Sequence, residues 1–120
     1  MPELYNEEII SQATHTKWAA KTVHFARAIA SNNLWAKRAW KEGAQDGELF
    51  VSEYQSAGRG RFSRRWSAPP DSSVIMSILL CPEFSPVKAP MLTLVMGLSV
   101  AQAVADLGLD VGIKWPNDVV

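Results

Sequence analysis

Residues 55–66 read QSAGRGRFSRRW, and the interpretation of the chain starts from this stretch. It contains four of the six arginines of the sequence and two glycines, which let a backbone pass close to another group. Segments rich in strand-forming residues flank it at 49–51 and 74–76, so the pattern predicts a loop between two strands. Guanidinium groups on a flexible loop favour a phosphate or carboxylate ligand. A solvated basic loop and a loop that contacts nucleic-acid phosphates are the alternatives.

Length and composition predict at most one domain with a packed core. The chain has 120 residues, 48% of them hydrophobic, and a net charge of zero. Neutral charge gives no general reason to bind nucleic acid. The single cysteine, Cys81, excludes an internal disulfide and is typical of a reducing compartment. The apolar stretch 91–100 is too short to cross a membrane and no basic secretion signal is present, which predicts a cytoplasmic protein.

The order of elements predicts an α+β fold, with a mixed β-sheet and helices packed on its face. After an N-terminal extension, residues 1–22, the pattern predicts strands at 23–30, 48–55, 73–80 and 111–115 and helices at 32–42 and 91–107.

Several packing expectations follow from these patterns. Ser31 is the expected N-cap of the first helix, and Gly43 is its expected C-terminal cap. Trp35 and Trp40 share the apolar face of that helix and are expected in the core. Strand 73–80 is apolar on both faces, as a central strand would be. Helix 91–107 carries only a narrow polar strip and is expected to be deeply packed.

A second motif, KWPND at residues 114–118, ends the last predicted strand. Lys114 stands at that strand end, before a proline that forces a turn. Together with the arginine loop, it predicts a converging positive cluster. Such clusters stabilise charge on a transferring phosphoryl or acyl-phosphate group.

These motifs together resemble the signatures of biotin protein ligases, the biotin–[acetyl-CoA-carboxylase] ligases. The matching segments are residues 55–61 with Arg64 and Trp66, residues 114–118, the SNN element at 31–33 and the LLCP element at 79–82. The resemblance runs from about residue 23 to the end of the chain. It implies a class II synthetase-like biotin/lipoate ligase catalytic domain at residues 23–120, present in part.

The resemblance implies a two-step reaction with biotin and ATP as substrates and Mg²⁺ expected. Biotin and ATP would form biotinyl-5′-AMP, and a lysine of a biotin carboxyl carrier domain would then attack this mixed anhydride. Arg61 and Lys114 are the implied catalytic residues, since two anions must meet and both need neutralisation.

The implied substrate contacts come from the same motifs. Ser31 and Gln55 would bind the ureido ring, Gly58 and Arg59 would line the biotin pocket, and Trp66 would pack beside the bicyclic ligand. The full set of implied substrate-binding residues is Ser31, Asn32, Asn33, Gln55, Gly58, Arg59, Gly60, Arg64 and Trp66. Asn32 departs from the threonine usual in the family. No metal ligand is assigned. Asn117 and Asp118 could help to position Mg²⁺ or pyrophosphate, or hold the turn after the strand, and the turn role is preferred.

Two expectations and three alternatives accompany this interpretation. The 22 residues before Val23 are too few for the winged helix of repressor members, so no operator binding is expected. The apolar end of the sequence suggests a piece of a longer enzyme that would ligate little alone. The alternatives are a lipoate–protein ligase, whose Arg-Arg-x-Ser-Gly-Gly-Gly element is absent here, a nucleic-acid-binding module, and an inactive structural fragment.

Overall fold

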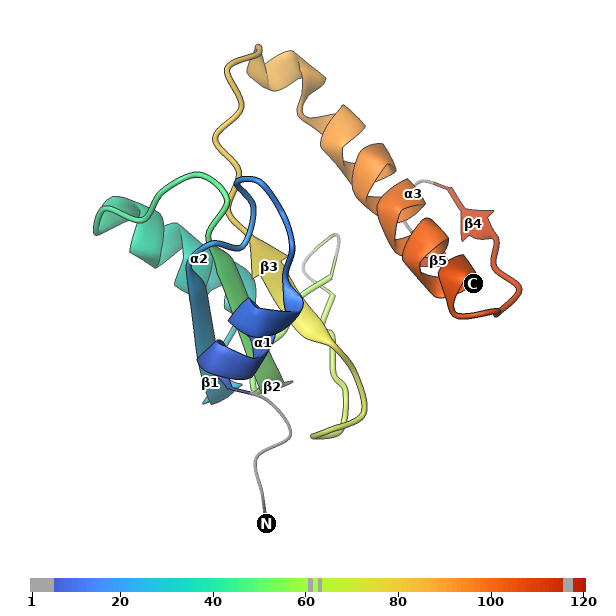
Figure 1. The fold of residues 1–120 in the computed structure, drawn as a ribbon, viewed down its shortest axis with the longest axis horizontal. Coiled ribbons are helices and arrows are strands. Elements are labelled where there is room, and N and C mark those ends of the chain that lie inside the picture. Colours follow the sequence, from blue (N-terminus) through green and yellow to red (C-terminus); the bar gives the residue numbers. More distant parts are fainter. Residues whose placement is uncertain (1–5, 61, 63, 116–117) are drawn as a thin grey trace. The chain divides into compact units, whose positions relative to one another are not determined.

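The computed structural model describes residues 6–60, 62, 64–115 and 118–120. The chain forms two compact units, Met1–Cys81 and Pro82–Val120. Figure 1 shows the elements of each unit.

The first unit is built on a mixed sheet, as predicted. Its elements are α1 (Glu7–Ala13), β1 (Val23–Ile29), α2 (Asn32–Lys41), β2 (Leu49–Gln55) and β3 (Ile75–Ile78). The sheet order is β1-β2-β3, with β1 parallel and β3 antiparallel to β2. A parallel pair needs a crossover connection, which α2 supplies between β1 and β2.

Local sequence explains where α2 begins and ends. The Ser31 side chain accepts a hydrogen bond from the Leu34 N–H at 3.4 Å, as an N-cap does. Gly43 follows the helix with φ of 105°, a left-handed conformation that glycine adopts without a Cβ penalty. Both predicted caps of this helix are confirmed.

An aromatic cluster joins α2 to the sheet. Phe50 of β2 is fully buried, with 0% exposure. The His24 ring of β1 stacks on it at 4.7 Å between centroids, and Trp35 of α2 meets it edge-on at 5.2 Å. The predicted core position of Trp35 is confirmed. The same prediction for Trp40 is wrong, because this side chain is 52% exposed in the last turn of α2, which extends beyond the edge of the sheet (Figure 1).

The predicted central strand at residues 73–80 is a second correction. The structure has a four-residue β3, and in the described part of the chain it pairs only with β2, which is the central strand. Met76 of β3 is 53% exposed. Apolar residues on both faces of this segment did not reveal burial, because burial also needs a partner strand and a covering layer.

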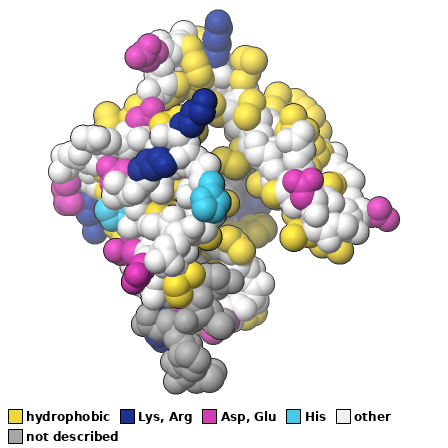
Figure 2. Space-filling model, viewed as in Figure 1, with side chains coloured by type: hydrophobic (Ala, Val, Ile, Leu, Met, Phe, Trp, Pro, Cys, Tyr) yellow, Lys and Arg dark blue, Asp and Glu magenta, His cyan; other side chains and the backbone are white. Residues whose placement is uncertain are grey.

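The second unit consists of η2 (Pro86–Lys88), α3 (Pro90–Asp106), β4 (Ile113–Lys114) and β5 (Asp118–Val119). Strands β4 and β5 pair antiparallel. Helix α3 was predicted to be deeply packed. Within its own unit this prediction is wrong, because only Gly97 and Ala101 of the helix are buried. Figure 2 shows hydrophobic side chains on the outside of α3. Two strands of two residues each are too small to cover a helix that is apolar on most sides.

The apolar length of this helical region also differs from the sequence expectation. Among the described residues, the segment Pro86–Asp106 is long and apolar enough to cross a membrane by length and composition alone. The sequence estimate considered only residues 91–100, whereas the helical segment extends on both sides of that run. A core helix of a soluble protein passes the same test.

The pH dependence of folding gives a first testable prediction, at Glu48. Its Oε1 lies 2.7 Å from Nε2 of His24, and its Oε2 accepts a hydrogen bond from the Gln45 N–H. The hydrogen bond with His24, and then the one with Gln45, lower the pKa of Glu48. A lowered folded-state pKa stabilises the fold above the ordinary glutamate value of 4.5, and this stabilisation is lost as pH falls through the folded-state pKa.

We therefore expect Glu48→Gln to flatten the decline of the unfolding free energy with acidification. Urea unfolding at a series of pH values from about 3 to 6 measures this decline, since that window brackets the ordinary glutamate titration. Glu53→Gln, in the same strand, removes a carboxylate outside this hydrogen-bonded pair and is the matched control, so the change in slope should be larger in Glu48→Gln. An unchanged profile in Glu48→Gln would contradict the assigned role.

Candidate functional site

The arginine loop, residues 55–66, leaves the end of β2 and doubles back on itself. Its contacts are Gly60 N–H to Arg64 O at 2.7 Å, Trp66 N–H to Gly58 O at 2.8 Å, and a β-bridge between Arg59 and Arg65. The segment is therefore a narrow antiparallel turn between β2 and β3, which confirms the predicted loop between strands.

The start of the loop is tied to the end of β1. The Ser56 N–H donates to Ile29 O at 3.0 Å, and the Ala57 N–H donates to Ala30 O at 2.8 Å. These bonds extend the parallel pairing of β1 and β2 past its last strand residues. They bring the entry of the loop next to Ser31, the N-cap of α2.

One hydrogen bond sets the orientation of the Gln55 side chain. The Asn32 backbone N–H donates to Gln55 Oε1 at 2.8 Å. A backbone N–H is only a donor, so the amide oxygen must occupy this position and the amide nitrogen must point elsewhere. Gln55 can therefore offer a ligand the two hydrogens of Nε2, while its oxygen is held by the helix N-terminus.

Gly58 is required by close contacts inside the loop. A Cβ at this position would lie 2.8 Å from Trp66 O and 2.9 Å from Gln55 Nε2. Either distance is shorter than a carbon atom tolerates. The same addition at Gly60 would meet Arg64 O at 3.8 Å, an ordinary van der Waals contact.

Ser31 and Asn33 bracket the first residue of α2. Ser31 is buried, and its Oγ uses one lone pair for the Leu34 N–H; toward the described residues the other lone pair and the hydroxyl hydrogen make no bond and could serve a ligand. Asn33 is exposed, and its Oδ1 accepts a hydrogen bond from Ser77 Oγ at 2.6 Å.

Asn32 differs from its neighbours because its side chain points into the protein. It is 2% exposed. Its Nδ2 donates to Phe50 O at 3.2 Å and to Ile75 O at 3.1 Å, and its Oδ1 accepts from Ser52 Oγ at 2.7 Å. Both amide hydrogens are thus used within the first unit, which leaves none for a substrate.

Comparison with known proteins identifies the family. Residues 25–120 match the model of the Biotin/lipoate A/B protein ligase family. The chain belongs to this family. The family predicted from the sequence motifs is therefore confirmed.

The relatives of this biotin/lipoate ligase chain are longer proteins. It is 32% identical over 120 residues to the Bifunctional ligase/repressor BirA of Bacillus spizizenii, which covers 99% of this chain and 37% of the relative. It is 40% identical over 80 residues to the Biotin–[acetyl-CoA-carboxylase] ligase of Mycobacterium tuberculosis. That match covers 62% of this chain and 30% of the relative. The chain thus spans about a third of the length of these curated relatives.

A solved structure supports the same fold. The chain resembles the biotin protein ligase of Aquifex aeolicus in complex with biotin and ATP, with a TM-score of 0.68 and 32% identity. The match covers 82% of this chain and 41% of that chain. The α+β fold with a mixed sheet, predicted for this ligase family member, is confirmed.

The remaining predicted site residues are placed only in part. Arg59, Arg64 and Trp66 are exposed on the loop, Trp66 by 63%. Lys114 is exposed at the end of β4 in the second unit and pairs in register with Asp118 of β5. Arg61 and Asn117 lie outside the described residues. The convergence of Arg61 and Lys114 therefore stays a prediction.

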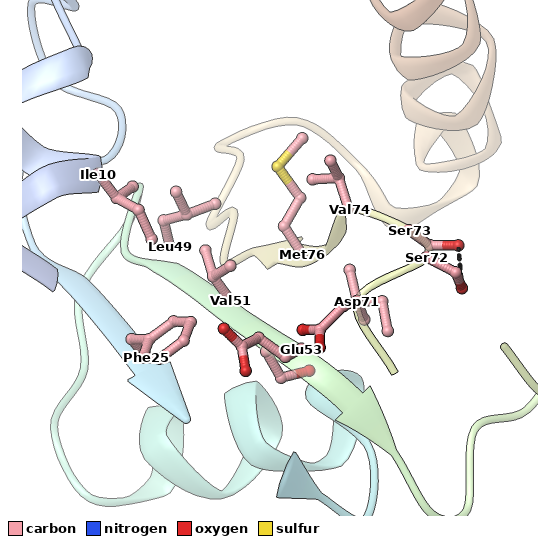
Figure 3. A pocket seen from close by; sticks show the side chains of 12 residues that line it. Ile10, Phe25, Leu49, Val51, Glu53, Asp71, Ser72, Ser73, Val74 and Met76 are labelled. Carbon is pink, nitrogen blue, oxygen red and sulfur yellow. Dashed lines mark hydrogen bonds between the residues drawn. The ribbon is translucent and has the colours of Figure 1, made fainter. Parts of the chain in front are cut away.

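A cavity of about 350 Å³ in the first unit lies apart from these residues. Figure 3 shows it on the sheet, where Phe25, Val51 and Met76 line it together with the carboxylates of Glu53 and Asp71. None of the predicted site residues lines this cavity. Its carboxylates would repel biotin and ATP, which are both anionic, so it is not a suitable site for them.

Sequence reasoning missed one residue of the site, Ser52. This hydroxyl is buried in β2 and binds Asn32. The sequence did contain a signal for the burial of Ser52. Side chains alternate along a strand, and Ser52 stands two positions after Phe50, on the face that α2 covers. A serine on an inward face needs a buried partner, and the neighbouring polar element at residues 31–33 contained one.

Paired glycine substitutions test the packing of the loop. Gly58→Ala should destabilise the chain by about 1–3 kcal/mol, the usual cost of forcing an extra carbon into a packed site. Gly60→Ala is the matched control and should stay within about 0.5 kcal/mol of wild type, as open surface positions do. Urea unfolding measures both, and exchange of the Trp66 amide hydrogen reports the loop itself. Equal stability of the two variants would contradict this geometry.

Proposed function

We propose that this chain forms the biotin-recognition part of a biotin protein ligase. The whole enzyme would join biotin and ATP into biotinyl-5′-AMP and then transfer biotin to a lysine of a biotin carboxyl carrier domain. One observation carries the proposal: Gln55 lies beside Ser31 with its oxygen held by the Asn32 N–H, and its Nε2 donates to none of the residues that the structure describes. Family membership and the likeness to a biotin protein ligase in complex with biotin and ATP support it.

The chemistry of Ser31 and Gln55 suits a ureido ring. Such a ring presents one carbonyl acceptor and two N–H donors. Gln55 Nε2 can donate to the carbonyl oxygen, because its own oxygen already accepts from Asn32. Ser31 Oγ keeps a lone pair that can accept from a ring N–H. A neutral, polar ring is therefore matched by neutral donors and acceptors, without a charged group.

The activation step sets an electrostatic requirement. The carboxylate of biotin must approach the α-phosphate of ATP, and both carry negative charge. In the proposed enzyme Arg61 and Lys114 neutralise these groups and the charge that develops between them. Arg59 and Arg64 add positive charge on the same loop. The glycine-containing loop would also shield the activated acyl group from water.

Mg²⁺ is expected with ATP, and in the described part of the chain no cluster of three histidine, cysteine, aspartate or glutamate side chains is placed to hold it. Magnesium in nucleotide sites is bound largely by substrate phosphates and water. No step in the proposal is therefore assigned to a metal ligand of this chain. A cytoplasmic location and a carrier-domain partner belong to the same proposal.

A lipoate ligase is the nearest rival and makes a different prediction for this site. Lipoate has no ureido group, so the donors of Gln55 would lose their partner on binding it, and buried donors without partners weaken binding strongly. Saturation-transfer NMR with the 120-residue chain detects weak binding and tests this. We expect a signal from biotin and a much weaker one from lipoate. Equal signals from both ligands would contradict biotin recognition.

The whole protein that contains this chain tests the activation step. Biotin should stimulate exchange of labelled pyrophosphate into ATP, because adenylate formation is reversible on the enzyme. Exchange that does not depend on biotin would count against the proposal. A nucleic-acid-binding module would instead show binding that falls steeply with salt and ignores biotin.

The substitution Gln55→Glu tests the donor role directly. A carboxylate still accepts from the Asn32 N–H but has no hydrogen to donate, so the position of the side chain is kept and its donors are removed. Biotin affinity should fall about 10–100-fold, which corresponds to the cost of about 1–3 kcal/mol for leaving a polar group unpaired. Gln102→Glu, on exposed α3, makes the same charge change and should leave biotin binding unaltered.

Arg61→Ala and Lys114→Ala test the two predicted cations. Each substitution should weaken the binding of biotinyl-5′-AMP by about 10–100-fold. This is the expected effect of losing one hydrogen bond to a charged group, because such a bond contributes about 1.5–3 kcal/mol. Isothermal titration calorimetry on the whole protein measures the affinities. Lys37→Ala, on the exposed side of α2, is the control and should bind like wild type. Near-normal affinity in both Arg61→Ala and Lys114→Ala would remove the electrostatic part of the proposal.

A further inference from the structure

We propose that Asn32 is a positioning residue that holds Gln55 and the stem of the arginine loop in the binding arrangement, and that it does not contact the substrate. This inference rests on the proposed function for the identity of the ligand. Its structural part concerns the ligand-free chain and stands separately.

The contacts of Asn32 join three elements through one residue. Its side chain reaches backbone oxygens of β2 and β3, at Phe50 and Ile75, and the hydroxyl of Ser52. Its backbone N–H, at the start of α2, holds Gln55 Oε1. These side-chain bonds anchor the first residue of α2 to the sheet, and with it the N–H that orients Gln55.

The contacts of Asn32 lie close to the point where the chain leaves the sheet to form the arginine loop. The antiparallel ladder between β2 and β3 ends at the pair Ser52 and Ile75. Beyond this pair, β2 continues to Gln55 beside β1, and the arginine loop leads back to the start of β3. Asn32 binds at the point where the two strands separate, and so it ties the strand that enters the loop to the strand that follows it.

The side chain at this position must donate two hydrogen bonds, to the Phe50 and Ile75 oxygens, and accept one, from the Ser52 hydroxyl. Asparagine does so, and burial to 2% exposure excludes solvent as a substitute partner. Threonine has a single hydroxyl hydrogen and cannot satisfy both carbonyl oxygens. Aspartate accepts only, and would place negative charge beside two carbonyl oxygens. Asn32→Thr is therefore the milder test of the role.

The first experiment uses NMR relaxation of the Gln55 side-chain amide in the ligand-free chain. In wild type we expect an ordered Nε2, because Oε1 is held. In Asn32→Thr we expect this order to be lost, while backbone amides of β1 remain as ordered as in wild type. Asn33→Asp is the matched control, because a carboxylate still accepts from Ser77, and it should retain an ordered Gln55. An ordered Gln55 in Asn32→Thr would overturn the proposal.

If Asn32→Thr does not fold, Ser52→Ala supplies the same readout with a smaller change. It removes the hydroxyl that holds the Asn32 oxygen and leaves both amide donors in place. We expect a partial loss of order at Gln55. An unaltered Gln55 side chain in Ser52→Ala, with Asn32→Thr unfolded, would count against a positioning role.

The second experiment is a double-mutant cycle on biotin affinity with Asn32→Thr and Gln55→Glu. If Asn32 acts through Gln55, Asn32→Thr should lower the affinity for biotin about tenfold in the wild-type background. The same substitution should lower it less than about twofold once Gln55 is replaced. Additive effects would show that Asn32 acts independently of Gln55 and would overturn the proposal. If wild type binds no biotin, the proposed function fails, while the relaxation measurement still decides the positioning role.

Discussion

The buried amide of Asn32 is the constraint on which the first unit depends. Its two donors satisfy backbone oxygens at Phe50 and Ile75, and its oxygen is satisfied by Ser52. A buried polar group without partners costs more than a bond contributes, so these elements must keep the arrangement that satisfies all of them. The start of α2, the end of the β2–β3 ladder and the side chain of Gln55 therefore form one connected unit.

The proposed chemistry explains why the hydrogen-bonded base around Asn32 would carry an exposed, basic loop. A neutral ureido ring needs well-placed donors and acceptors, which a rigid helix start and strand end provide. In the proposed reaction the anionic groups need positive charge beside them, which the arginines of this loop would supply. The requirement for Gly58, with backbone and Gln55 atoms close by, links the two parts.

Sequence patterns predicted the elements of the first unit better than their burial. The strand predicted at 23–30 is Val23–Ile29, and the helix predicted at 32–42 is Asn32–Lys41, because caps and glycines are local signals. Trp40 is exposed where burial was expected, and within its own unit α3 is largely uncovered, since apolar character says what a residue prefers and not which surface covers it. The role of Asn32 was missed for a related reason, because its partners lie 18 to 43 positions away in sequence.

The sequence by itself determined the family, the loop between β2 and β3 and the caps of α2, because motifs, turns and caps depend on residues that are neighbours along the chain. The tertiary structure decided which of the three polar residues at 31–33 points inward, which atom of Gln55 the start of α2 holds, and which strand is central. These outcomes depend on hydrogen bonds between segments far apart in the chain, and only the folded arrangement brings their donors and acceptors together.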